Sequence, residues 1–159
     1  MINISVPHNI ASGKVLTSSS EVYNSPPEKA IDGKFNSGRM KPGGVCAHTK
    51  QEASWINIDL GTEHAISSIY LVGRGDKCDN CPAQSSGWTI RVGNTGTNTD
   101  PVCMENVDAY GGRPIPIQCT TKLSGNHVKI ESETWMVLCE VLIFEEEEEE
   151  EEEEAGTYL

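Results

Sequence analysis

The sequence predicts an all-β fold, an antiparallel β-sandwich or jelly roll of discoidin-like type. Short segments rich in Ile and Val recur along the chain and are separated by turn signals such as Ser25-Pro26-Pro27 and Gly111-Gly112-Arg113-Pro114. The 159 residues include 15 glycines and 8 prolines, a composition typical of strands joined by turns. No long stretch shows a helical period, and the length suits a single domain with a real core.

Six segments carry the clearest strand signals. The first, residues 55–60, alternates polar and apolar side chains, which predicts a strand with one buried face. The other candidates, at residues 66–72, 88–92, 115–119, 127–131 and 137–144, are short runs that include β-branched or aromatic residues. Strands at this spacing without intervening helices indicate two antiparallel layers packed around a core.

Six cysteines, an even number, stand at positions 46, 78, 81, 103, 119 and 139. In a small loop-rich domain they predict three disulfides and an oxidising compartment, so a secreted, extracellular protein is expected. Two alternatives are open for Cys78 and Cys81, which are half of a zinc site or a redox pair. A structural disulfide is favoured, because the sequence has no second Cys-x-x-Cys for zinc and no βαβ pattern for a redox motif.

The formal net charge of −12 comes mostly from ten consecutive glutamates at residues 145–154. The remaining 14 acidic and 12 basic residues form no basic patch, which disfavours nucleic-acid binding, and no apolar run reaches the roughly 20 residues of a membrane span. We expect a folded domain over residues 1–144 and a disordered acidic tail over residues 145–159. The tail either solubilises the protein, which we favour, or attracts Ca²⁺ or basic partners loosely. We expect it to contribute nothing to ligand binding at the site described next.

A histidine and an Arg-Gly-Asp tripeptide form the strongest candidate binding motif. His48 precedes Arg74-Gly75-Asp76, which follows the predicted strand at residues 66–72. A ring nitrogen, a planar five-donor cation and a carboxylate are suited to recognising hydroxyl groups. The alternative is structural: Arg74 pairs only with Asp76, and His48 is a loop histidine with local partners. Integrin recognition by the tripeptide is disfavoured, since such tripeptides are common by chance.

Together these features resemble the F-type lectins, the fucolectin family. The segments that carry the resemblance are Asn9-Ile-Ala-Ser-Gly-Lys14, Lys29-Ala-Ile-Asp-Gly33, Cys46-Ala-His48, Trp55-Ile-Asn-Ile-Asp-Leu-Gly61, Arg74-Gly-Asp76 and Cys139-Glu-Val141. The resemblance covers about residues 5–144 and implies a calcium-containing lectin domain for fucose or a related terminal sugar. Its partners would be fucosylated or galactose-type glycans and a second copy of the chain in a homo-oligomer. No catalytic motif is present, so no enzymatic activity is expected. The alternative is a discoidin-type adhesive module whose sugar site is lost or altered.

The resemblance implies a sugar site made of one histidine and two basic residues. His48 and Arg74 match the first two positions. Once a three-residue insertion in the loop is allowed, Gln84 stands where the family has its second basic residue, and Lys77 is a basic neighbour of Asp76. We expect the sugar to lie over Arg74, between His48 and the Cys78–Cys81 loop, with the Gln84 amide in reach.

The resemblance also implies a structural Ca²⁺ site and a disulfide pairing. Its ligands would be mixed oxygens, a set that suits Ca²⁺: the carbonyls of Lys29, Lys34, Val45 and Cys139 and the side chains of Asp32 and Glu140. The alternative is that Asp32-Gly33 is an ordinary turn and Glu140 an exposed strand residue. The implied disulfides are Cys46–Cys139, Cys78–Cys81 and Cys103–Cys119.

Overall fold

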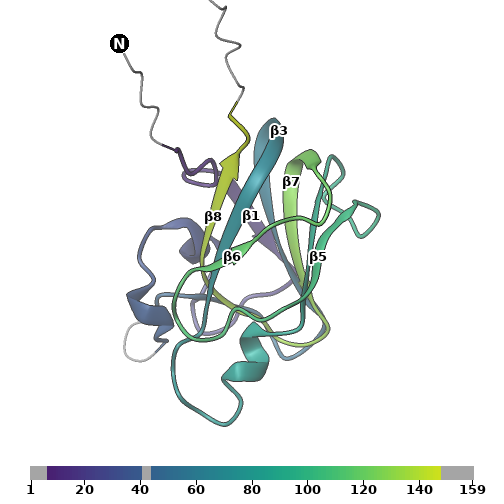
Figure 1. The fold of residues 1–159 in the computed structure, drawn as a ribbon. Helices are drawn as coiled ribbons and strands as arrows, with labels where there is room; N and C mark the ends of the chain where they lie inside the picture. Colours follow the sequence, from purple (N-terminus) through teal and green to yellow (C-terminus); the bar gives the residue numbers. More distant parts are fainter. Residues whose placement is uncertain (1–6, 41–43, 148–159) are drawn as a thin grey trace, which may run out of the picture.

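The computed structural model describes residues 7–40 and 44–147, which form a two-layered β-sandwich (Figure 1). The described residues contain eight strands, all paired antiparallel, and three short 3-10 helices but no α-helix. The strands are β1 (Val15–Ser18), β2 (Ala47–His48), β3 (Ser54–Gly73), β4 (Trp88–Gly93), β5 (Val102–Val107), β6 (Ile115–Ile117), β7 (Leu123–Ser132) and β8 (Val137–Glu145). The helices are η1 (Pro27–Ile31), η2 (Asn36–Gly38) and η3 (Pro82–Ser85). The predicted all-β class is therefore confirmed.

The long strand β3 belongs to both layers. Its first half pairs with β1 and β7, and its second half pairs with β6 and β8. The register with β7 shifts between Asp59 and His64, and Gly61 in this bulge has a φ of 82°, a left-handed conformation that glycine adopts at least cost. The two strands predicted at residues 55–60 and 66–72 are thus one strand, which continues through the bulge between them.

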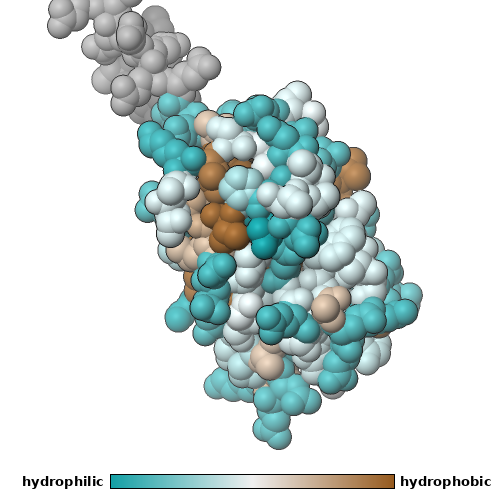
Figure 2. All heavy atoms as spheres, turned by 90° about the vertical axis from the view of Figure 1, so that its right-hand side faces the viewer, coloured by the Kyte–Doolittle hydropathy of each residue, from teal (hydrophilic) through white to brown (hydrophobic). Residues whose placement is uncertain are grey.

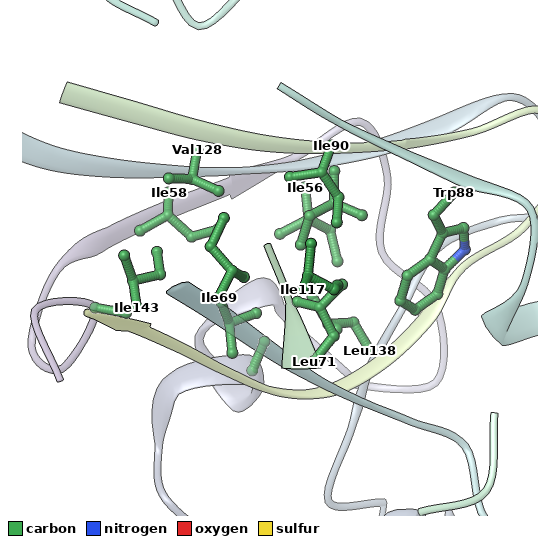
Figure 3. Close-up of a cluster of buried hydrophobic side chains, with 14 of the residues drawn as sticks. Ile56, Ile58, Ile69, Leu71, Trp88, Ile90, Ile117, Val128, Leu138 and Ile143 are labelled. Atoms are coloured by element: carbon green, nitrogen blue, oxygen red, sulfur yellow. The ribbon is translucent and has the colours of Figure 1, made fainter. Parts of the chain in front are cut away.

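The core lies between the two layers (Figure 3). Inward side chains of β3, β4 and β7 meet inward side chains of the second half of β3, β6 and β8. In the close-up these are Ile56, Ile58, Ile90 and Val128 on one side and Ile69, Leu71, Ile117, Leu138 and Ile143 on the other, all of them buried. Burial of this apolar surface is the main favourable contribution to folding.

The sequence pattern did not indicate three of the strands. β1 and β2 are only four and two residues long, too short for a periodic signal. β5 begins directly after Pro101 and carries polar residues in its second half. The other predicted strands are present, with β6 ending at Ile117 and β8 extending to Glu145.

The first glutamates of the acidic run are part of the folded body. The carboxylate of Glu145, the last residue of β8, lies 2.7 Å from Nδ1 of His64, and the Glu146 amide donates to the Ala65 carbonyl at 2.8 Å. The expected boundary after residue 144 therefore falls inside a strand, and residues 148–159 of the expected tail lie outside the described residues. Among the described helices, none is long and apolar enough to cross a membrane.

Candidate functional site

A hollow of about 520 Å³ lies where β3 ends and β8 begins. It brings together His48, Arg74 and Gln84, three of the residues that the sequence predicted for the site. The other lining residues are Tyr23, Ser25, Met40, Gly44 and Trp135. Arg74 follows directly on Gly73, the last residue of β3, so its backbone is held by the sheet.

The Arg74 side chain is fixed in place at this hollow. Its Nε donates to Oδ2 of Asp76 at 3.0 Å, and its Nη1 donates to Oε1 of Gln84 at 2.6 Å. The backbone is held as well, since the Arg74 amide donates to Oγ of Ser85 at 2.8 Å and its carbonyl accepts from the Gly111 amide at 2.9 Å. With 9% of its surface exposed, Arg74 is a pre-oriented donor and not a mobile surface cation.

Asp76 acts on the hollow through Arg74, since it does not itself line it. Its Oδ2 also accepts from the Met40 amide at 2.7 Å, and its carbonyl accepts from the Tyr110 hydroxyl at 3.0 Å. The carboxylate thereby ties the loop after η2 to the arginine. Arg74 thus pairs with Asp76, as the structural alternative predicted. The same contact also orients Arg74 toward the hollow.

The glycine of the Arg-Gly-Asp tripeptide is required by packing. The Gly75 amide donates to the Gly38 carbonyl at 2.8 Å, and a Cβ on Gly75 would overlap the Ser37 carbonyl oxygen. The backbone of the tripeptide is therefore pressed against η2 and is not presented as a free loop. The packing of Gly75 and the contact between Arg74 and Asp76 account for the tripeptide, so integrin binding is not required to explain it.

His48 is buried and held in one orientation. Its Nδ1 lies 2.7 Å from the Thr49 carbonyl, so this nitrogen carries the proton and donates, which leaves Nε2 as an acceptor in the neutral ring. Burial lowers the pKa of His48 below its ordinary 6.5; the bond to Thr49 opposes this shift, and the nearby charge of Arg74 adds to it. The ring is consequently neutral at pH 7.

Two aromatic side chains flank His48, and sequence reasoning identified neither. The ring centroid of Tyr23 lies 5.2 Å from that of His48 at an interplanar angle of 77°, and that of Trp135 lies at 6.2 Å and 80°. Tyr23 is 79% exposed and, like Asn24, has a positive φ, a conformation that costs energy for a non-glycine residue. Both aromatic residues lie in loops, so no periodic signal marked them.

The Cys78–Cys81 disulfide supports the hollow from outside. Neither cysteine lines it, and Lys77 is exposed and does not line it either. Instead the backbone N–H of Gln84 donates to the Cys81 carbonyl at 3.2 Å, so the cystine braces the turn that leads into η3 and positions Gln84. We expected the Cys78–Cys81 loop to lie beside the ligand, but no residue of this loop lines the hollow.

The six positions implied for a cation come from three segments that the structure holds together. The Gly33 amide lies 3.2 and 3.1 Å from the two carboxylate oxygens of Glu140, which joins the η1 loop to β8. The Cys46–Cys139 disulfide fixes Val45 and its neighbours beside the same strand. In the η1 loop, Oδ1 of Asp32 accepts from the Lys34 amide at 2.9 Å.

The chemistry of this region fits a hard cation. Glu140 is only 3% exposed, contrary to the alternative of an exposed strand residue, and burial followed by the charge of Asp32 raises its pKa to about 7, although the Gly33 amide opposes the shift. Within residues 7–40 and 44–147 no group of three or more His, Cys, Asp or Glu side chains is placed to hold a metal. A cation here would therefore rely on Asp32, Glu140 and the carbonyls of Lys29, Lys34, Val45 and Cys139, a mixture of oxygens that Ca²⁺ accepts.

Comparison with known families identifies this architecture. Residues 15–145 match the family model of the F5/8 type C domain. The chain belongs to this family. The match spans every described strand, so both the sandwich and the loops around the hollow are part of the family domain.

Within the family, the chain is similar to fucolectins. It is 31% identical over 119 residues to fucolectin-3 of Anguilla japonica, covering 70% of this chain and 62% of that protein, so it spans about three fifths of that relative's length. A crystal structure of a fucolectin from Morone saxatilis (striped bass) serum superposes with a TM-score of 0.77 at 26% identity, covering 89% of this chain and 50% of that one. A fucose binding module of Streptococcus pneumoniae, 24% identical, shows the same fold with a TM-score of 0.71 and covers 88% and 96% of the two chains. These similarities confirm the resemblance to F-type lectins.

Proposed function

We propose that the chain is a carbohydrate-binding lectin domain that recognises a terminal sugar of the fucose or galactose type on a glycan. The observation that carries this proposal is the fixed guanidinium of Arg74, which lies in one hollow with the neutral ring of His48 and the aromatic side chains of Tyr23 and Trp135. Two relatives that are 31% and 32% identical to the chain are named fucolectins. No enzymatic role is proposed.

The donors and acceptors in the hollow suit sugar hydroxyls. Asp76 and Gln84 take two of the five N–H groups of Arg74, so the others are available to a hydroxyl and a ring oxygen. The Nε2 atom of His48 accepts from a further hydroxyl. Tyr23 and Trp135 offer ring surface to the C–H or methyl groups of the sugar.

Gln84 sets the strength of this site. Its Oε1 is bound to Arg74, so its amide nitrogen is the donor that it offers to a ligand. A neutral amide replaces a cation here, and a hydrogen bond to a charged group contributes about 1.5–3 kcal/mol, roughly twice a neutral one. We therefore expect weaker binding than a site with two cations would give.

We infer that Ca²⁺ binds between the η1 loop, Val45 and Glu140 as a structural ion. The support is the burial of Glu140 with the charge of Asp32 close by, a pairing that a cation would relieve. Bound Ca²⁺ would hold the η1 loop to β8 and would stabilise the native form by mass action. Melting in the presence and absence of chelator tests this directly, and an unchanged melting temperature after verified metal removal contradicts it.

A secreted, extracellular protein acting in recognition or adhesion is the setting that we propose. All six cysteines are paired as the resemblance implied, and three disulfides in one small domain suit an oxidising compartment. A homo-oligomer remains a proposal that sedimentation analysis of the full chain would test.

The experiment that tests the sugar site is a calorimetric titration of fucose and of galactose into the wild type and Gln84→Arg. We expect at least one sugar to bind the wild type and fucose to bind Gln84→Arg more tightly. If neither sugar binds either folded protein, the hollow is not a lectin pocket. The discoidin-type adhesive module then becomes the better interpretation.

A further inference from the structure

A second hollow, of about 890 Å³, lies at the far end of β8 from the sugar site. Its floor is the outer face of β3 and β8, where Tyr70 is the register partner of Leu142 and Ser68 the partner of Phe144. The rings of Tyr70 and Phe144 meet edge to face, with centroids 5.9 Å apart. We call this hollow the terminal groove; its lining residues are Pro7, Ser67, Ser68, Tyr70, Pro114, Lys122, Leu142, Phe144, Glu145, Glu146 and Glu147.

The floor of the terminal groove is apolar and only partly covered. Tyr70, Leu142 and Phe144 are half-buried, and the exposed Pro7 and Pro114 stand beside them. The surface in Figure 2 is largely hydrophilic but has a hydrophobic patch, brown, in the upper left part of the coloured body. Aromatic and aliphatic side chains in a concave surface are typical of a binding site for an apolar group of a ligand or partner.

The rim of the groove is acidic. Glu145, Glu146 and Glu147 follow one another there, and the sequence continues into seven further glutamates. Lys122 is the one cation among the lining residues; it is 90% exposed and lies 3.7 Å from Glu146. Glu145 faces His64 at 2.7 Å. The lining residues thus include more carboxylates than lysine or arginine side chains, and the rim is acidic beside the apolar floor.

We propose that the terminal groove binds a basic peptide segment of a partner protein. An apolar side chain of the segment would lie on Tyr70, Leu142 and Phe144, while its Lys or Arg side chains meet the glutamate rim and the aromatic ring faces. The acidic run would also attract such a segment from a distance. This inference does not depend on the sugar site, because the two hollows share no lining residue. Tyr70 and Arg74, which line one hollow each, are four residues apart along the chain, about 13 Å at about 3.3 Å per residue.

The test uses the full chain and a synthetic peptide of alternating Lys and Leu, with binding followed by fluorescence anisotropy. Two control peptides replace every Leu by Ser or every Lys by Glu. We expect the Lys–Leu peptide to bind more tightly than both controls and its binding to weaken with added salt. Phe144→Ala should reduce its affinity by about fivefold, because one aromatic contact is lost.

A matched pair of charge changes gives a second test that does not depend on the packing of Phe144. Lys122→Glu removes the cation from the groove and should tighten binding of the Lys–Leu peptide. Lys50→Glu makes the same change in net charge at an exposed position that does not line the groove and should have a much smaller effect. The inference is overturned if the two variants behave alike, or if the Lys–Ser peptide binds as tightly as the Lys–Leu peptide. It is also overturned if truncation after Glu147 abolishes binding, because attraction to the acidic run alone would then account for it.

Discussion

The Cys46–Cys139 disulfide joins segments that carry residues of both candidate sites. His48 lies two residues after Cys46, and Glu140 follows Cys139 directly. The cystine is fully buried in a small cluster with Val72 and Val137. Removing it through Cys46→Ala and Cys139→Ala should therefore destabilise the protein and weaken both sugar and Ca²⁺ binding.

The size of the stability loss follows from the loop that the disulfide closes. With a sequence separation of 93 residues, the chain-entropy model gives about 4.6 kcal/mol at 25 °C. The same model gives about 3 kcal/mol for Cys103–Cys119, whose separation is 16 residues. The double alanine variant of Cys103 and Cys119 is the matched control, because it removes a disulfide far from both candidate sites.

Denaturant unfolding measures the loss of stability in each of the two variants, and titrations with sugar and with Ca²⁺ measure their ligand affinities. We expect the Cys46–Cys139 variant to lose about 1.5 kcal/mol more than the control and to bind both ligands less well. The control should keep wild-type affinities wherever it remains folded. Equal losses of stability together with wild-type ligand affinities in the Cys46–Cys139 variant would refute this reasoning.

Three further predictions concern single residues of the two sites. Glu140→Gln should abolish the rise in melting temperature that Ca²⁺ causes. It should not lower the melting temperature in chelator, because the amide keeps an acceptor for Gly33 and removes a buried charge. A retained Ca²⁺ effect contradicts the cation site. Arg74→Lys should reduce sugar affinity about tenfold or more in calorimetry, because the planar fork is lost, whereas Arg113→Lys at an exposed position should not. The folded-state pKa of His48 lies below 6.5, so the stability that its neutral ring contributes is present above pH 6.5 and is lost as the pH falls below it. Sugar affinity should decline in that acidic window, and His48→Gln should remove the His48 contribution to this pH dependence.

The sequence carried enough information for the fold class and for part of the site. The alternation at residues 55–60 and the apolar runs indicated the sandwich, because burial of one strand face imposes a period of two. The sequence did not reveal that β3 is a single strand, because a glycine such as Gly61 is common both in bulges and in turns. The resemblance to F-type lectins placed His48, Arg74 and Gln84 in one site, and they line one hollow.

Other features of the site depend on contacts between distant segments. Tyr23 and Trp135 reach His48 only through the conformations of their loops, and no local pattern encodes these. The role of Asp76 as the partner that orients Arg74 depends on the loop after η2, where the Met40 amide, 36 residues away in sequence, donates to the same carboxylate. The burial of Glu140 likewise arises from the docking of the η1 loop and is not evident from a single acidic residue in an apolar strand.

The central claim is that the hollow over Arg74 binds a sugar. Titration of fucose and of galactose into the wild type with saturating Ca²⁺, compared with Gln84→Arg and Arg74→Lys under the same conditions, tests it most directly. We predict saturable binding by the wild type, tighter binding by Gln84→Arg and strongly reduced binding by Arg74→Lys. Equal affinity in all three folded proteins, or binding in none of them, would contradict the claim.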